Sequence, residues 1–201
     1  TAESLEGGLR GDLFGRRVRW EMSGFDMSFR NVVIRENVGG LPALANAGRE
    51  RLRGGEIEMS VELLQSLRLQ GSAAYHDSWF EDYARLRPDG SVQQLAGKAL
   101  ELAPQALGAL GLVLAPAQGL VGSVVCNYAG SRYLNKSNTV QAGDYATLDA
   151  GLGWRGPHYE LRIDGTNLTD RRDPVAESEI GDAQFYTLPG RTVFVTLELS
   201  L

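Results

Sequence analysis

Strict two-residue alternation of apolar and polar side chains near the end of the chain constrains the fold most. Between residues 145 and 155, one set of alternate positions is apolar and the other is mostly polar or glycine. The apolar set is Ala146, Leu148, Ala150, Leu152 and Trp154. Successive side chains of a strand point to opposite faces, whereas a helix would scatter both sets around its axis. The pattern therefore predicts a β-strand with one apolar and one polar face.

The same alternation recurs along most of the chain. Odd positions of residues 56–63 are apolar and even positions are polar, and residues 67–76 largely repeat the pattern. We predict nine strands, near residues 4–13, 17–34, 47–63, 67–81, 100–115, 119–132, 145–155, 158–168 and 190–201. Each is long enough for the roughly 9–11 residues with which a tilted strand crosses a bilayer.

The connections between the predicted strands alternate strictly in length. Short connections fall near Gly15, Gln65, residues 117–118 and residues 156–157. Long connections fall near residues 35–46, 82–99, 133–144 and 169–189. Short periplasmic turns and longer extracellular loops are typical of outer-membrane β-barrels. The sequence therefore predicts an all-β fold, a section of an antiparallel transmembrane β-barrel whose last strand runs toward the periplasm.

Strand register can be predicted at two of the short connections. Pairing Glu62 with Arg68 around Gln65 aligns like faces and sets opposite charges side by side. Pairing Arg155 with His158 aligns the next faces in the same way. That second register places Trp154 opposite Tyr159, and aromatic residues at the rims of such barrels form interfacial girdles.

The same register brings two carboxylates, Asp149 and Asp164, face to face. Paired carboxylates occur in glycosidases. The alternative is that both side chains point into a barrel lumen and bind arginines of a neighbouring strand or of a plug. The chain offers no sugar-binding cleft in support of the enzymatic interpretation.

Composition excludes several classes of protein. The chain of 201 residues has 25 glycines and a net charge of −5, which suits a turn-rich β-protein and argues against nucleic acid as a partner. No run of about 18 apolar residues predicts a membrane-spanning helix. Cys126 is the only cysteine, so neither an intrachain disulfide nor a thiolate metal cluster is expected. No metal or cofactor site is predicted.

Several short motifs add a family resemblance. The segment Asn167-Leu168-Thr169-Asp170 precedes the final strand by about twenty residues, with Pro189-Gly190-Arg191 leading into that strand. The set of matching residues also includes Asn46, Gly48, Gly54, Gly55, Glu56, Tyr75, His76, Asp77, Phe80, Tyr145, Asp149 and Tyr186. In this order and spacing, the chain resembles the C-terminal end of TonB-dependent outer-membrane receptors. One departure is the terminal Leu201, where family members usually have Phe or Trp.

The resemblance implies a 22-stranded barrel with a plugged lumen, of which residues 1–201 would form the C-terminal part. The N-terminal plug domain and the TonB box would lie outside this chain. Such receptors are not enzymes. They sit in the outer membrane of Gram-negative bacteria and import scarce nutrients, most often ferric siderophores or related metal chelates, with energy from TonB. Expected partners are therefore TonB, outer-membrane lipid, a small-molecule ligand, and the barrel-assembly machinery through the last strand.

The long loops would supply ligand contacts, because aromatic and arginine side chains suit large anionic chelates. The candidates are Trp79, Phe80, Tyr83, Arg85, Arg132, Tyr133 and Tyr186. Two alternatives need neither a plug nor TonB: a passive porin, and another outer-membrane barrel protein such as a barrel enzyme. A soluble β-sandwich with a core of packed aromatics is a further alternative.

Overall fold

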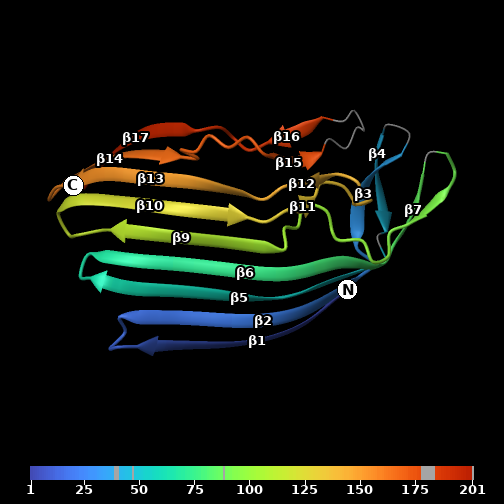
Figure 1. Ribbon diagram of the computed structural model, residues 1–201, viewed down its shortest axis with the longest axis horizontal. Helices are drawn as coiled ribbons and strands as arrows, with labels where there is room; N and C mark the ends of the chain where they lie inside the picture. The colour runs from blue at the N-terminus through green and yellow to red at the C-terminus, as the bar shows by residue number, and fades with distance from the viewer. Residues whose placement is uncertain (39–40, 47, 88, 178–183, 201) are drawn as a thin grey trace.

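One antiparallel sheet of nine strands forms the body of the molecule (Figure 1). The structure is a computed structural model that describes residues 1–38, 41–46, 48–87, 89–177 and 184–200. In sheet order, the strands are β1 (Ala2–Leu13), β2 (Val18–Arg30), β5 (Arg49–Leu64), β6 (Leu67–Asp82), β9 (Ala106–Leu114), β10 (Gly119–Ala129), β13 (Tyr145–Arg155), β14 (Tyr159–Thr166) and β17 (Thr192–Leu199). Each strand pairs with its neighbour along the chain or across one long connection, so the predicted all-β fold is confirmed. The sheet remains open, with β1 and β17 at its edges.

Each of the four long connections contains a small hairpin. These are β3 (Val33–Val38) with β4 (Leu41–Asn46), β7 (Ala84–Leu86) with β8 (Val92–Gln94), β11 (Arg132–Tyr133) with β12 (Gln141–Ala142), and β15 (Pro174–Glu177) with β16 (Phe185–Thr187). All four hairpins lie at one end of the sheet and the tight turns lie at the other (Figure 1). In the described part of the chain, no helix has the length and apolarity needed to span a bilayer.

Some strands are shorter than the sequence predicts. The strand predicted over residues 17–34 ends at Arg30, because Asn31 adopts a left-handed φ of 56° and its N–H bonds to the Gly48 carbonyl at 2.8 Å. The strand predicted over residues 100–115 begins only at Ala106. Its carbonyl accepts a hydrogen bond from the Gly130 N–H at 2.8 Å, just beyond the end of β10.

Aliphatic side chains line one face of the sheet across strand boundaries. Val18 lies opposite Val61, which lies opposite Leu69, and the row continues through Leu112 and Val124. These residues do not face a protein core. Leu110, in the middle of β9, is 58% exposed, and Cys126 beside it is also exposed. An apolar face without protein cover is typical of a barrel wall that contacts lipid.

The predicted register of the β5–β6 hairpin is confirmed. Glu62 lies opposite Arg68, and its Oε1 is 3.8 Å from the Arg68 Nη2. The predicted register of the β13–β14 hairpin is wrong by two residues, because Arg155 pairs with Glu160 rather than with His158. Trp154 therefore lies opposite Leu161, not opposite Tyr159.

Glycines account for the observed β13–β14 register. Asp164 lies opposite Gly151, where a Cβ would collide with its carboxylate, and Arg162 lies opposite Gly153, where a Cβ would meet the Arg162 Cγ at 2.7 Å. The two glycines thus leave room for an ion pair between Arg162 Nη2 and Asp164 Oδ1 at 2.8 Å. The predicted approach of Asp149 to Asp164 is wrong for the same reason.

The outer face changes character at a row of glycines. Gly7, Gly24 and Gly55 are cross-strand partners on β1, β2 and β5, and the row continues to Tyr75 on β6. On the turn side of this row the outer face is apolar, with Trp20 among its aliphatic residues. On the loop side charged residues appear on β2, β5 and β6, beginning with the row of Asp26, Arg53 and Asp77, whereas β1 places Leu5 in that row. Side chains on the lumenal face change in the opposite sense on β2, where Phe25, Met27 and Phe29 replace the charged residues found nearer the turns.

Candidate functional site

A polar groove of about 840 Å³ lies on the concave face of the sheet, between β1 and β10. Its charged lining residues are Arg10, Asp12, Arg19, Glu21, Glu58 and Arg68. Glu21 and Glu58 are direct cross-strand partners. Like charges in this position repel each other, and Arg10, opposite Glu21 on β1, offsets part of this repulsion. Glu58 is therefore the carboxylate better suited to a cationic group of a partner.

The long connection between β6 and β9 folds onto a small buried core. Phe80, Tyr83 and Leu95 are at most 2% exposed, and the two ring centroids are 5.0 Å apart. The Leu95 N–H bonds to the Tyr83 carbonyl at 2.8 Å, which ties β8 back to the end of β6. Phe80 and Tyr83, both candidates for ligand contacts, therefore hold this loop together from inside.

The other candidate residues are spread over several parts of the loop region. Trp79 lies on the outer face, with the Arg53 guanidinium 5.0 Å from the centroid of its ring. Arg85 is half-buried on β7, Tyr133 is half-buried on β11, and Tyr186 is exposed on β16.

Arg132, next to Tyr133, is buried. Its guanidinium lies 5.1 Å from the centroid of the Tyr145 ring, and its Nη2 donates to the Pro174 carbonyl at 2.8 Å. Among the described residues its Nη1 has no hydrogen-bond partner. The structure brings together Phe80 with Tyr83, and Arg132 with Tyr133, but none of the seven candidates lines the polar groove.

The connection between β10 and β13, residues 130–144, links the loops on both sides of it. The Asn138 amide side chain pairs with the backbone of Ala99, with its Oδ1 accepting from the N–H at 2.8 Å and its Nδ2 donating to the carbonyl at 2.9 Å. On the same side, Lys136 Nζ lies 2.6 Å from Glu101 Oε1. On the other side, Asn135 Nδ2 donates to Glu177 Oε2 at 2.9 Å. Three loops are therefore joined by side chains of one of them.

Sequence reasoning did not identify this linking role. The available signal was the polar segment of residues 135–139, because asparagine favours turns and tolerates a left-handed backbone. Asn138 has a left-handed φ of 55°. In this conformation its side-chain amide bonds to both the N–H and the carbonyl of Ala99, as a neighbouring strand would.

Asn167 is the centre of the polar network that joins the end of β14 to the start of β17. Its Nδ2 donates to the carbonyls of Arg171, at 2.9 Å, and Pro189, at 2.8 Å, while its Oδ1 accepts from the Arg171 N–H at 3.0 Å. Its own N–H donates to Asp149 Oδ1 at 2.7 Å, and Asp149 Oδ2 also accepts from Asn127 Nδ2 at 3.0 Å. Asn167 is 9% exposed, so these bonds satisfy a buried amide.

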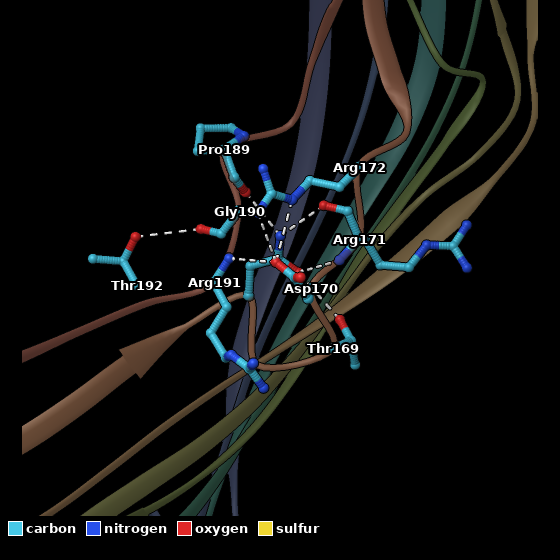
Figure 2. A network of polar contacts seen from close by, with 9 residues as sticks. Thr169, Asp170, Arg171, Arg172, Pro189, Gly190, Arg191 and Thr192 are labelled. Carbon is cyan, nitrogen blue, oxygen red and sulfur yellow. Dashed lines mark hydrogen bonds and ion pairs between the residues drawn. The ribbon is translucent and has the colours of Figure 1, made fainter.

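Asp170 completes the network from the exposed side (Figure 2). Its Oδ1 accepts a hydrogen bond from the Arg191 N–H at 2.9 Å, and Figure 2 shows the two chain segments side by side at this point. The Arg191 N–H, together with the charge of Arg172, holds the pKa of Asp170 below its ordinary value. The NLTD segment and the Pro-Gly-Arg segment therefore close the base of the last long loop and place β17 beside β14.

Metal-binding side chains do not gather in the part of the chain that the structure describes. No group of three histidine, cysteine, aspartate or glutamate side chains there could hold a metal ion. Asp149 and Asp164, the candidate carboxylate pair, are instead bound to amide donors and to Arg162, respectively.

Comparison with known proteins gives a consistent result. The family model described as TonB dependent receptor-like, beta-barrel, matches residues 1–168. The ferric yersiniabactin uptake receptor FyuA of Yersinia pestis has a TM-score of 0.78 and 19% identity over 98% of this chain and 30% of its own. The siderophore receptor PiuA of Acinetobacter baumannii has a TM-score of 0.77 and 18% identity over 98% of this chain and 28% of its own. The copper transporter OprC has a TM-score of 0.75 and 16% identity over 100% of this chain and 31% of its own. The chain thus spans less than a third of the length of these proteins.

Proposed function

The chain belongs to the TonB-dependent receptor β-barrel family, and we propose that it forms the C-terminal wall of a receptor that imports a scarce nutrient with energy from TonB. Members of this family are located in the outer membrane of Gram-negative bacteria, and so is this protein. The family consists of transport receptors rather than enzymes. The observation that supports the proposal most strongly is a nine-stranded antiparallel sheet with an aliphatic outer face and a polar groove on its inner face.

We propose that the sheet is completed by preceding strands into a 22-stranded barrel, and that an N-terminal plug domain occupies the groove. The open edges of β1 and β17 support further strands, since an unpaired edge in lipid would leave backbone groups without partners. The facing carboxylates Glu21 and Glu58 support a plug that presents a basic side chain there. The TonB-binding segment would precede that plug, and the barrel-assembly machinery would engage β17.

The proposed cargo is a ferric siderophore or a related metal chelate. The similar structures support this class, since they include receptors for siderophores and a copper transporter. Among the seven candidate contacts, we propose that Arg85, Tyr133 and Tyr186 act directly, because they lie in the loops and are at least partly exposed. Phe80, Tyr83 and Arg132 would act through the shape of the loops, and Trp79 lies on the outer face.

Uptake of radiolabelled ferric siderophores by cells that carry the full-length receptor, with and without functional TonB, tests the proposal. We expect uptake of at least one siderophore and its loss without TonB. Uptake that is independent of TonB, and that extends to unrelated small solutes, would instead identify a passive porin. Replacing Arg85 and Tyr186 by alanine should weaken uptake, whereas Arg16→Ala in the exposed β1–β2 turn should not.

A further inference from the structure

The three residues proposed to contact the ligand directly lie in three different loops. Arg85 belongs to the connection between β6 and β9, Tyr133 to the connection between β10 and β13, and Tyr186 to the connection between β14 and β17. Because β10 and β13 stand between β9 and β14 in the sheet, the connection of residues 130–144 lies between the other two, and we call it the middle loop. The spacing of the three contacts therefore depends on how the middle loop is joined to its neighbours.

Asn138 joins the middle loop to the connection between β6 and β9 through the backbone of Ala99. Ala99 forms an antiparallel bridge with Trp79, in which the backbone groups of residues 98 and 100 bond to β6. The N–H and the carbonyl of Ala99 therefore point away from β6, since backbone groups of successive residues in such a pair point to opposite sides. The Asn138 side chain bonds to both groups, at 2.8 and 2.9 Å. Ala99 is thus held between β6 and the middle loop.

Two further contacts lie along the same boundary. Lys136 Nζ is 2.6 Å from Glu101 Oε1, and the two side chains are only 14% and 29% exposed. The Leu102 N–H donates to the carbonyl of Tyr133 at 2.8 Å, so one of the proposed ligand contacts is itself part of the boundary. Partial burial strengthens these polar contacts, because the surroundings of the charges are less polar than water.

The middle loop is also bonded to the connection between β14 and β17. The buried Arg132 donates from Nη2 to the Pro174 carbonyl at 2.8 Å, and Asn135 Nδ2 donates to Glu177 Oε2 at 2.9 Å. Pro174 and Glu177 are the first and last residues of β15, which pairs with β16, the strand that carries Tyr186. Each neighbouring loop is therefore fixed to the middle loop at more than one point, which restricts rotation of one loop about another.

We propose that the middle loop holds Arg85, Tyr133 and Tyr186 at a fixed spacing in the ligand-free receptor, with Lys136 and Asn138 as positioning residues. These two side chains act through the neighbouring connection, to which both are bonded. Loops that are already in place lose less conformational entropy on binding, and a larger fraction of the receptors is ready to bind at any time. The inference rests on the proposed ligand contacts, whereas the joining of the loops is measurable without a ligand.

Distances between two spin labels in the ligand-free, full-length receptor test the joining of the loops. The labels are attached to cysteines at the exposed positions Val92, in the connection between β6 and β9, and Gln141, in the middle loop. Cys126 and any other native cysteine are first replaced by alanine, because Cys126 is exposed and would also be labelled. We expect the wild-type receptor to give a single narrow distribution of distances.

The test variant combines Lys136→Met with Asn138→Ala and so removes the side-chain contacts to Glu101 and Ala99. The control variant is Thr139→Ala, since the Thr139 hydroxyl bonds to Asn135 within the middle loop itself. We expect the distance distribution to widen at least twofold in the test variant and to keep its width in the control.

Binding kinetics then test the positioning role. The probes are ferric yersiniabactin, ferric citrate and a ferric catecholate, applied to the unlabelled wild type and variants. For a probe that the wild type binds, the association rate constant of the test variant should fall at least fivefold, because fewer receptors have the loops in place. Its dissociation rate constant should change less than twofold. Lys136→Arg alone, which retains the ion pair with Glu101, should bind as the wild type does.

An unchanged distance distribution in the test variant would overturn the proposal. Weaker binding that arises wholly from faster dissociation would overturn it too, because that pattern would make Lys136 and Asn138 direct ligand contacts. If the double variant does not fold, Lys136→Met alone should still widen the distribution, and an unchanged width would count against the proposal in the same way. If the wild type binds none of the probes, the proposed cargo is wrong, whereas the distances still decide whether the middle loop fixes the spacing.

Discussion

Replacement of Leu110 by arginine should separate the two faces of the sheet most clearly. Leu110 is the central outward residue of β9, four residues from Ala106 toward the loops and four from Leu114 toward the turns. With a rise of about 3.4 Å per residue and a tilt of about 40°, it lies roughly 10 Å from each end of the lipid-facing band, near the bilayer midplane. An arginine there should cost about 2–4 kcal/mol of folding free energy.

Two neighbours provide matched comparisons. Ala109 adjoins Leu110 in the chain but lines the polar groove, so Ala109→Arg should change stability by no more than about 1 kcal/mol. Leu161 faces lipid like Leu110 but lies opposite Trp154, close to the periplasmic turn. Leu161→Arg should therefore cost only about 0–1 kcal/mol, since the penalty falls toward the interface.

The assay is denaturant unfolding of the full-length receptor in lipid vesicles, with the three variants measured beside the wild type. A cost at Leu110 no larger than the cost at Ala109 would contradict the assignment of faces. Equal costs at Leu110 and Leu161 would contradict the assignment of depth while leaving the faces intact.

Three further predictions concern the loops. Asn167→Ala should destabilise the receptor by about 1–3 kcal/mol, because the loop loses the hydrogen bonds that the buried Asn167 side chain makes to Pro189 and Arg171. Asn167→Gly should cost nearly as much, although glycine tolerates the φ of 48°. The lowered pKa of Asp170 predicts a stabilising contribution that is complete above its ordinary value of 3.8 and is lost as the pH falls through the lower folded value. Denaturation midpoints should therefore fall more steeply below pH 3.8 for the wild type than for Asp170→Asn, in which Arg191 faces a neutral amide. Asn138→Ala should speed amide hydrogen exchange at residue 99 while leaving β9 protected, and unchanged exchange at residue 99 would argue against the link between the loops.

The nine strands and their two faces could be predicted from the sequence because both are written in local patterns. The alternation of residues 145–155 determines the two faces of β13 whatever the neighbouring strands are. The alternation of short and long connections determines which ends of the strands meet. The NLTD segment could be located from its position before the last strand, although its physical role could not.

Long-range packing decided what the pattern left open. Two registers of the β13–β14 hairpin keep like faces together, and only the space above Gly151 selects the one in which Asp164 fits. Their residue types marked Phe80 and Tyr83 as ligand contacts. Their burial, however, depends on the return of β8 onto the end of β6, which packs Leu95 against them and which no local pattern describes.

 The packing of Leu95 against both rings is a contact between segments that are distant in the extended chain, so it exists only once the loop has folded. The change in side-chain polarity at the row of Gly7, Gly24 and Gly55 also depends on contacts between different strands. Each strand shows the change by itself, but the sheet aligns the changes into one level across β1, β2 and β5. The sequence alone therefore determined the strands and their faces. The registers, the covered loop residues and the common level at which the outer face changes character required the tertiary structure, because each depends on which distant residues become neighbours.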